Sequence, residues 1–146
     1  MARRIISVVV ALMVAFAIIT AFEQLGPQLF KTPVIDSRDP KTISDMMANM
    51  PLAAYLWLLL GYAMASLLGG IVAGFISGRN NYIPALMIGV FLTVGSVMNF
   101  IMIHHPLWFM VANVLLCVPF AMIGYAVVKK KKEKPTSIPD GVGETT

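Results

Sequence analysis

Four long stretches of almost purely apolar residues constrain this chain more than any other feature. They cover roughly residues 5–22, 51–76, 83–103 and 107–128. A helix rises about 1.5 Å per residue and needs about 20 apolar residues to cross the hydrocarbon core of a bilayer. Backbone groups in lipid must be paired within their own segment, so each stretch is predicted to be a helix. The sequence therefore predicts an all-α integral membrane protein with four transmembrane helices.

Composition agrees with this interpretation. Of the 146 residues, 58% are hydrophobic and only 12% are charged, whereas a soluble domain carries about 25% charged residues. The single cysteine, Cys117, lies inside an apolar stretch and is expected to act as a small hydrophobic residue. The first stretch follows "MARR" and has an alternative interpretation as a cleaved signal peptide, with "AFA" at 15–17 as the cleavage site. Because the apolar run continues to Phe22, a retained helix is favoured.

Positive charge predicts the orientation of the four spans. Eight of the eleven basic residues lie near the two ends or in the second loop: Arg3, Arg4, Arg79, Lys129, Lys130, Lys131, Lys132 and Lys134. Loops rich in Lys and Arg stay in the cytoplasm. Both termini are therefore predicted to be cytoplasmic, and the 23–50 loop and the turn at 104–105 to lie outside.

The segments outside the spans have distinct compositions. The first half of the 23–50 loop is rich in proline, which favours extended or turned chain. In its second half, Asp39 and Pro40 suit the start of a helix, and apolar residues then recur on one face: Ile43, Met46, Met47 and Met50. A short amphipathic helix on the outer membrane surface is predicted there. Residues 1–128 would form one membrane domain, and 129–146 a basic and then disordered cytoplasmic tail.

Small residues are spaced for close helix packing, which drives association of helices in lipid. The members of this pattern are Gly61, Ala65, Gly69, Ser66, Gly70, Gly74 and Gly78 in the second span and Gly89 in the third. Their partner is left open: another helix of the chain, a second copy, or a larger membrane complex. Trp57, Trp108, Lys129 and Lys130 are predicted to anchor the spans at the membrane interfaces.

Polar residues inside the apolar stretches are candidates for function. Five of them are predicted to converge near the outer side: Glu23, Asn99, His104, His105 and Asn113. Asn99 and Asn113 lie at matching depth and have an alternative role in bonding to each other, the histidines in capping a turn, and Glu23 in contacting solvent or a basic residue. Histidine also titrates near neutral pH and binds metals. With Met46, Met47 and Met50 nearby, a Cu(I) site is a further alternative.

No catalytic or cofactor motif accompanies these residues. The sequence has no phosphate-binding glycine loop, no HExxH pair and no CxxC pair. No cofactor, no resident metal and no nucleic-acid partner are expected, and the lipid bilayer is the predicted surrounding.

Several short motifs resemble those of a group of small four-helix bacterial inner-membrane proteins to which no activity is assigned. The similarity rests on Glu23, "MPLAA" at 50–54, the Gly69–Gly70 pair, Asn99, and "HPLWF" at 105–109, an HPxWF-type outer turn. It implies a bacterial inner-membrane location and transfers no catalytic role. We expect a non-enzymatic accessory or scaffolding subunit that packs against itself or a larger complex. The alternatives are a metal-ion or proton carrier or sensor using the outer polar residues, and a membrane enzyme that acts on lipid.

Overall fold

Five helices make up the part of the chain that the computed structural model describes, which is residues 2–31, 39–78, 80–103 and 105–130. They are α1 (Ala2–Phe30), α2 (Pro40–Ala48), α3 (Leu52–Ser77), α4 (Ile83–Met102) and α5 (Leu107–Lys130). All except α2 are long and apolar enough to cross a membrane. The protein is therefore an all-helical, multi-pass membrane protein by the length and composition of its helices.

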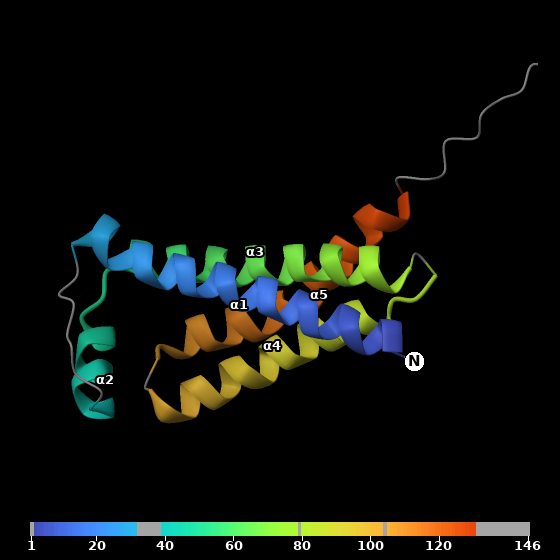
Figure 1. The fold of residues 1–146 in the computed structure, drawn as a ribbon. Coiled ribbons are helices and arrows are strands. Elements are labelled where there is room, and N and C mark those ends of the chain that lie inside the picture. The colour runs from blue at the N-terminus through green and yellow to red at the C-terminus, as the bar shows by residue number, and fades with distance from the viewer. Residues whose placement is uncertain (1, 32–38, 79, 104, 131–146) are drawn as a thin grey trace, which may run out of the picture.

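The four long helices form one bundle, and α2 lies across one end of it (Figure 1). The N-terminus and the end of α5 lie at the opposite end. There, the Arg3 guanidinium donates a hydrogen bond of 2.6 Å to the carbonyl of Ile76, near the end of α3. A positive side chain is favourable at a helix C-terminus, where carbonyls lack helical donors. The predictions for His104, Arg79 and the tail from residue 131 lie outside the described residues.

Helix α1 runs farther than the sequence predicted. The apolar stretch ends near Phe22, and Pro27 was expected in turned chain, but the helix continues through Pro27 to Phe30. Proline has no N–H, so the carbonyl of Glu23 loses its helical donor without the helix ending. The helix stops at Lys31, which has a positive φ of 49°, a left-handed conformation common at helix ends. Glu23 thus lies within a helix and not at its end.

Helix α2 is fixed at both of its ends. The carboxylate of Asp39 accepts a hydrogen bond of 3.0 Å from the Thr42 hydroxyl, and Pro40 occupies the first turn. Such a side-chain cap satisfies donors that have no partner within the helix. Near the other end, the Tyr55 hydroxyl donates to the carbonyl of Met47. This bond holds α2 against the start of α3.

Helix α3 is the centre of the bundle and uses its small residues against two neighbours. On one side, a Cβ at Gly61 would lie 2.8 Å from Phe22 of α1, and one at Gly69 would lie 3.5 Å from Ala15. Ala65, on the same face, is fully buried. The Gly61, Ala65 and Gly69 stripe therefore packs within the chain, against α1 and, at Gly69, also against Ile88 of α4, which would lie 3.0 Å from the added Cβ.

The other small-residue face of α3 packs against α5. A Cβ at Gly70 would meet the backbone carbonyl of Ala121, and one at Gly124 of α5 would meet the carbonyl of Leu67. A Cβ at Gly74 would lie 3.2 Å from the ring of Tyr125, also of α5. The two backbones thus approach each other reciprocally, which is the arrangement that small residues permit in membrane helices. Ser66, on this face, is fully buried.

Of three further glycines, Gly89 packs against another helix as predicted, whereas Gly78 and Gly124 differ from the prediction. Gly89 of α4 approaches the Cα of Val118 of α5, at 2.8 Å from its ideal Cβ position. Gly78 packs against nothing within 4 Å and has φ +95°, so its role is to end α3 in a conformation that glycine adopts without strain. Gly124 was not predicted to pack against another helix. It lies one turn after Ala121 on α5 and makes one of the closest approaches to α3.

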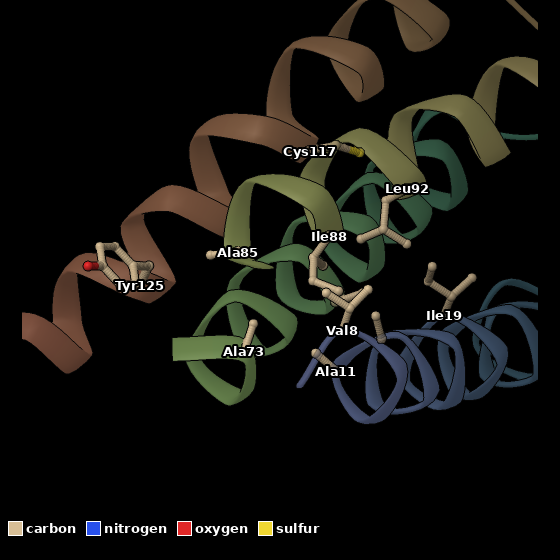
Figure 2. Close-up of a cluster of buried hydrophobic side chains, with 11 residues drawn as sticks. Val8, Ala11, Ile19, Ala73, Ala85, Ile88, Leu92, Cys117 and Tyr125 are labelled. Atoms are coloured by element: carbon tan, nitrogen blue, oxygen red, sulfur yellow. The ribbon is translucent and has the colours of Figure 1, made fainter. Parts of the chain in front are cut away.

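The core lies where α1, α3, α4 and α5 meet. Figure 2 shows Ile88 and Leu92 pointing from α4 toward α1, where Val8 lies, with Cys117 on α5. Many large apolar side chains point outward instead, among them Leu107, which is 78% exposed, and Met13, which is 67% exposed. Outward apolar side chains suit a surface that faces lipid, where exposure of such groups carries no hydrophobic cost.

Candidate functional site

A cavity of about 200 Å³ lies at the α2 end of the bundle. All five helices and the segments next to them contribute to its wall. The lining residues are Glu23, Gly26, Pro27, Met46, Met47, Met50, Ala54, Leu58, Tyr62, Asn99, Phe100, His105 and Phe109. The wall is mainly apolar, and its side-chain hydrogen-bonding groups belong to four residues: Glu23, Tyr62, Asn99 and His105.

The structure brings together three of the five residues singled out in the sequence. Glu23, Asn99 and His105 line this one cavity. Asn113 does not line it, and His104 lies outside the described residues. Tyr62 was missed, although it follows Ala54 and Leu58 at intervals of four and so shares their helix face. That spacing was the available signal for its place in the cavity.

Glu23, Tyr62 and Asn99 form the polar part of the cavity. The Tyr62 side chain interacts electrostatically with Glu23, and the side chains of Asn99 and Ser96 lie near its hydroxyl. Pro27 has no N–H and so cannot donate the usual helical hydrogen bond to the backbone carbonyl of Glu23. No Lys or Arg of the described segments forms an ion pair with Glu23.

His105 is held by its surroundings in one ring orientation. Its Nδ1 lies 2.7 Å from the carbonyl oxygen of Ile103, so this nitrogen donates and Nε2 of the neutral ring keeps a lone pair. The ring stacks on Phe109 at 5.6 Å and meets Phe100 edge-on at 5.0 Å. Burial lowers the pKa of His105 below its usual value, and the bond to Ile103 partly opposes this. The neutral ring is therefore favoured at neutral pH.

Asn113 lies deeper in the bundle, in a separate buried polar cluster. Its Oδ1 accepts hydrogen bonds from the Ser96 hydroxyl at 3.2 Å and from the Cys117 thiol at 3.3 Å. The structure thus gives Asn113 these two partners in place of the predicted bond to Asn99. Its Nδ2 is buried with no partner among the described residues.

The two tryptophans lie near the α2 end and have different surroundings. The Trp57 indole N–H donates to the carbonyl of Phe22 at 3.0 Å, and the two rings pack at 4.7 Å. The Trp57 side chain therefore connects α3 to α1. Trp108 is 43% exposed and meets Tyr55 edge-on. At the opposite end of the bundle Lys129 is exposed, and the side chain of Lys130 lies outside the described part of the structure.

Metal ligands of the usual charged or imidazole kind do not cluster in the described segments. No three His, Cys, Asp or Glu side chains lie together there in a way that would hold an ion. Methionine thioethers are a different ligand class, and three of them line the cavity. Comparison of the chain with family models, curated proteins and solved structures finds no match. The function must therefore be inferred from the geometry of the cavity.

Proposed function

We propose that this chain is a non-enzymatic membrane protein that binds a small cationic ligand in the cavity beneath α2. It would serve as an accessory or sensing subunit of a bacterial inner membrane, with both termini in the cytoplasm and the cavity outside. The observation that carries this proposal is the meeting of Glu23, Tyr62 and Asn99 in one apolar-walled cavity. Binding sites combine apolar walls with a few convergent polar groups.

The charge of the ligand is inferred from the groups that would contact it. Glu23 supplies a carboxyl group without a basic partner in the described segments. The side-chain amide oxygen of Asn99, another lining residue, is a further acceptor. The aromatic residues Tyr62, Phe100 and Phe109 line the cavity, and aromatic rings attract cations. A cation with an apolar body would therefore satisfy both the polar groups and the wall.

The cavity volume limits how much of a ligand it holds. An apolar cavity of about 150 Å³ in another protein binds benzene. About 200 Å³ therefore suits a small ammonium group with a few carbon atoms.

A purely scaffolding role has less support than the sequence suggested. That role rested partly on small-residue stripes whose partner the sequence left open. Gly61 and Gly69 are used against α1, Gly70 and Gly74 against α5, and Gly89 against α5. The cavity, and not these stripes, is therefore the basis for the accessory role.

Native mass spectrometry of the protein, extracted gently from its own membrane, tests this proposal. We expect a stoichiometric small adduct on the wild type that is lost in Glu23→Gln. Gln24→Ala is the matched control, because Gln24 is the next residue and does not line the cavity. An adduct that survives Glu23→Gln, or a stoichiometric second protein without any small adduct, would contradict the proposal.

A soft metal ion is a second candidate ligand, favoured by one specific observation. The thioether residues Met46, Met47 and Met50 line the same cavity as His105. Thioethers select Cu(I), and a histidine ligand commonly donates its other ring N–H to a carbonyl, as Nδ1 does to Ile103.

A Cu(I) titration against a chromophoric chelator, under reducing conditions, separates the two candidates. If Cu(I) is the ligand, the double variant Met46→Leu and Met47→Leu loses affinity while Glu23→Gln retains it. If the ligand is an organic cation, the wild type shows no uptake of Cu(I) that competes with the chelator.

A further inference from the structure

A second cavity, of about 230 Å³, lies between α1 and α4. Its walls are formed largely by apolar side chains of the two helices, including Phe16 and Ile19 of α1 and Phe91 and Leu92 of α4. Its lining also includes polar residues. Glu23, Tyr62 and Asn99 line this cavity as well as the cavity beneath α2. The two cavities therefore lie next to each other and share these three polar residues.

The second cavity exists because α1 and α4 are not closely packed at this level. Helix α1 packs mainly against α3 and makes far fewer contacts with α4. Figure 1 shows α4 diverging from α1 toward the α2 end of the bundle. Gly95 of α4 lines the cavity, and a Cβ added to it would meet no atom within 4 Å. A groove thus remains between the two helices below Glu23.

A groove of this kind does not stay empty in a bilayer. A void deprives its lining of dispersion contacts, and a lipid chain in the hydrocarbon core can fill it without a desolvation cost. Phe16 and Phe91, two of the lining side chains, are exposed in the protein alone. An acyl chain is therefore the natural occupant of the groove, and the polar residues above it decide which lipid supplies that chain.

We propose that both cavities hold one amphiphile, a lipid with an amine headgroup. The ammonium group would lie at Glu23, Tyr62 and Asn99, and one acyl chain would lie between α1 and α4. This inference rests on the proposed function and names its ligand class. An ammonium group donates hydrogen bonds, and the Glu23 carboxyl and the Asn99 amide oxygen can accept them. Charge complementarity thus favours an aminolipid over an anionic lipid.

The position of the groove also predicts the route of entry. The headgroup site is reached sideways from the bilayer, between α1 and α4, without movement of α2. A ligand that partitions into the membrane would then be strongly favoured over a short amine with the same headgroup. Recognition would depend on the chain as well as on the charge.

Lipid titration monitored by native mass spectrometry tests this inference. The probes are phosphatidylethanolamine and phosphatidylglycerol with identical acyl chains, added to delipidated protein. We expect about tenfold tighter retention of phosphatidylethanolamine by the wild type, which corresponds to about 1.4 kcal/mol. Gly95→Phe, which fills open space in the groove, should remove this preference. Val94→Phe is the control, because Val94 is 55% exposed and does not line the groove.

The outcomes distinguish failure of this inference from failure of the proposed function. If butylamine binds in a Glu23-dependent manner while Gly95→Phe leaves lipid retention unchanged, the groove has no role and the headgroup site stands. If neither butylamine nor phosphatidylethanolamine depends on Glu23, both proposals are wrong. Equal retention of the two lipids by the wild type also overturns the aminolipid assignment.

Photo-crosslinking of the unmodified protein provides a test that does not depend on a variant. Phosphatidylethanolamine with a diazirine on its acyl chain should label peptides that contain Phe91 or Phe16, in competition with unlabelled phosphatidylethanolamine. Labelling that is confined to other lipid-facing positions, or that phosphatidylglycerol displaces equally well, would overturn the inference.

Discussion

Replacing Gly70 with alanine should weaken the contact between α3 and α5 on which the bundle depends. The added Cβ would lie 2.8 Å from the carbonyl carbon of Ala121 and closer still to its oxygen. Carbon atoms pack best at about 3.5–4.0 Å, so the two backbones must separate by about 1 Å. The obstructing atoms belong to the backbone of α5 and cannot rotate away. The reciprocal contact of Gly124 with Leu67 would be loosened by the same movement.

The expected cost follows from this geometry. Overpacking of a close contact destabilises a protein by about 1–3 kcal/mol, and we expect Gly70→Ala to fall within that range. Gly95→Ala is the matched control, since both glycines lie inside transmembrane helices and the Cβ at Gly95 enters open space. Alanine is the better helix former by up to about 1 kcal/mol, so Gly95→Ala should be neutral or stabilising.

Reversible unfolding in mixed micelles of mild detergent and dodecyl sulfate measures both variants against the wild type. The midpoint should fall for Gly70→Ala and stay level or rise for Gly95→Ala. If the two variants unfold at the same midpoint, the close approach of α3 and α5 does not exist in the membrane protein, and the account of the small-residue stripes is refuted.

Three further predictions use the same unfolding measurement. Trp57→Phe keeps the ring contact and removes the N–H bond to the Phe22 carbonyl, so it should destabilise the fold by about 0.5–1.5 kcal/mol; no change would mean that the bond is replaced by water. Asn113→Leu removes two hydrogen bonds and also an unpartnered buried amide, so it should stay within about 1 kcal/mol of the wild type; a larger loss would reveal a partner for Nδ2. Burial lowers the pKa of His105, so the unfolded chain binds a proton more readily and stability should fall as pH drops below about 6.5; a His105→Gln variant with the same pH dependence would contradict that assignment.

The membrane-spanning helices could be predicted from sequence because they depend on a property of consecutive residues. A run of about 20 apolar residues must pair its own backbone groups in lipid, and four such runs became four long helices. The end of α1 could not be found in this way. The local rule against proline inside a helix failed at Pro27 because only one carbonyl, that of Glu23, loses its donor there.

The candidate site was predicted in part, for reasons that follow from helix geometry. Counting residues from the helix ends placed Glu23 and Asn99 near the outer ends of their spans, and both line the cavity. Depth alone does not fix how each helix is rotated about its axis. Asn113 has a matching depth but faces Ser96 and Cys117. Tyr62 was overlooked because an aromatic residue within an apolar run resembles a core residue.

The glycines at helix contacts could also be predicted only in part. The stripes on α3 could be identified by their spacing, but the helix that each stripe contacts depends on the arrangement of the whole bundle. Gly124 does not belong to a regularly spaced stripe of small residues in α5. Its close packing is visible only in the structure, where it lies against the Leu67 carbonyl of α3. Gly78 fits the spacing of a stripe, yet its positive φ makes it the end of α3.

The most direct measurement is a structure of the protein in a nanodisc made from its own membrane lipids. We expect ligand density among Glu23, Tyr62 and Asn99 that continues as an acyl chain between α1 and α4, past Gly95. A bundle in which α1 and α4 close over Gly95, with no density beside Glu23, would contradict the claim that this end of the protein is a ligand-binding site.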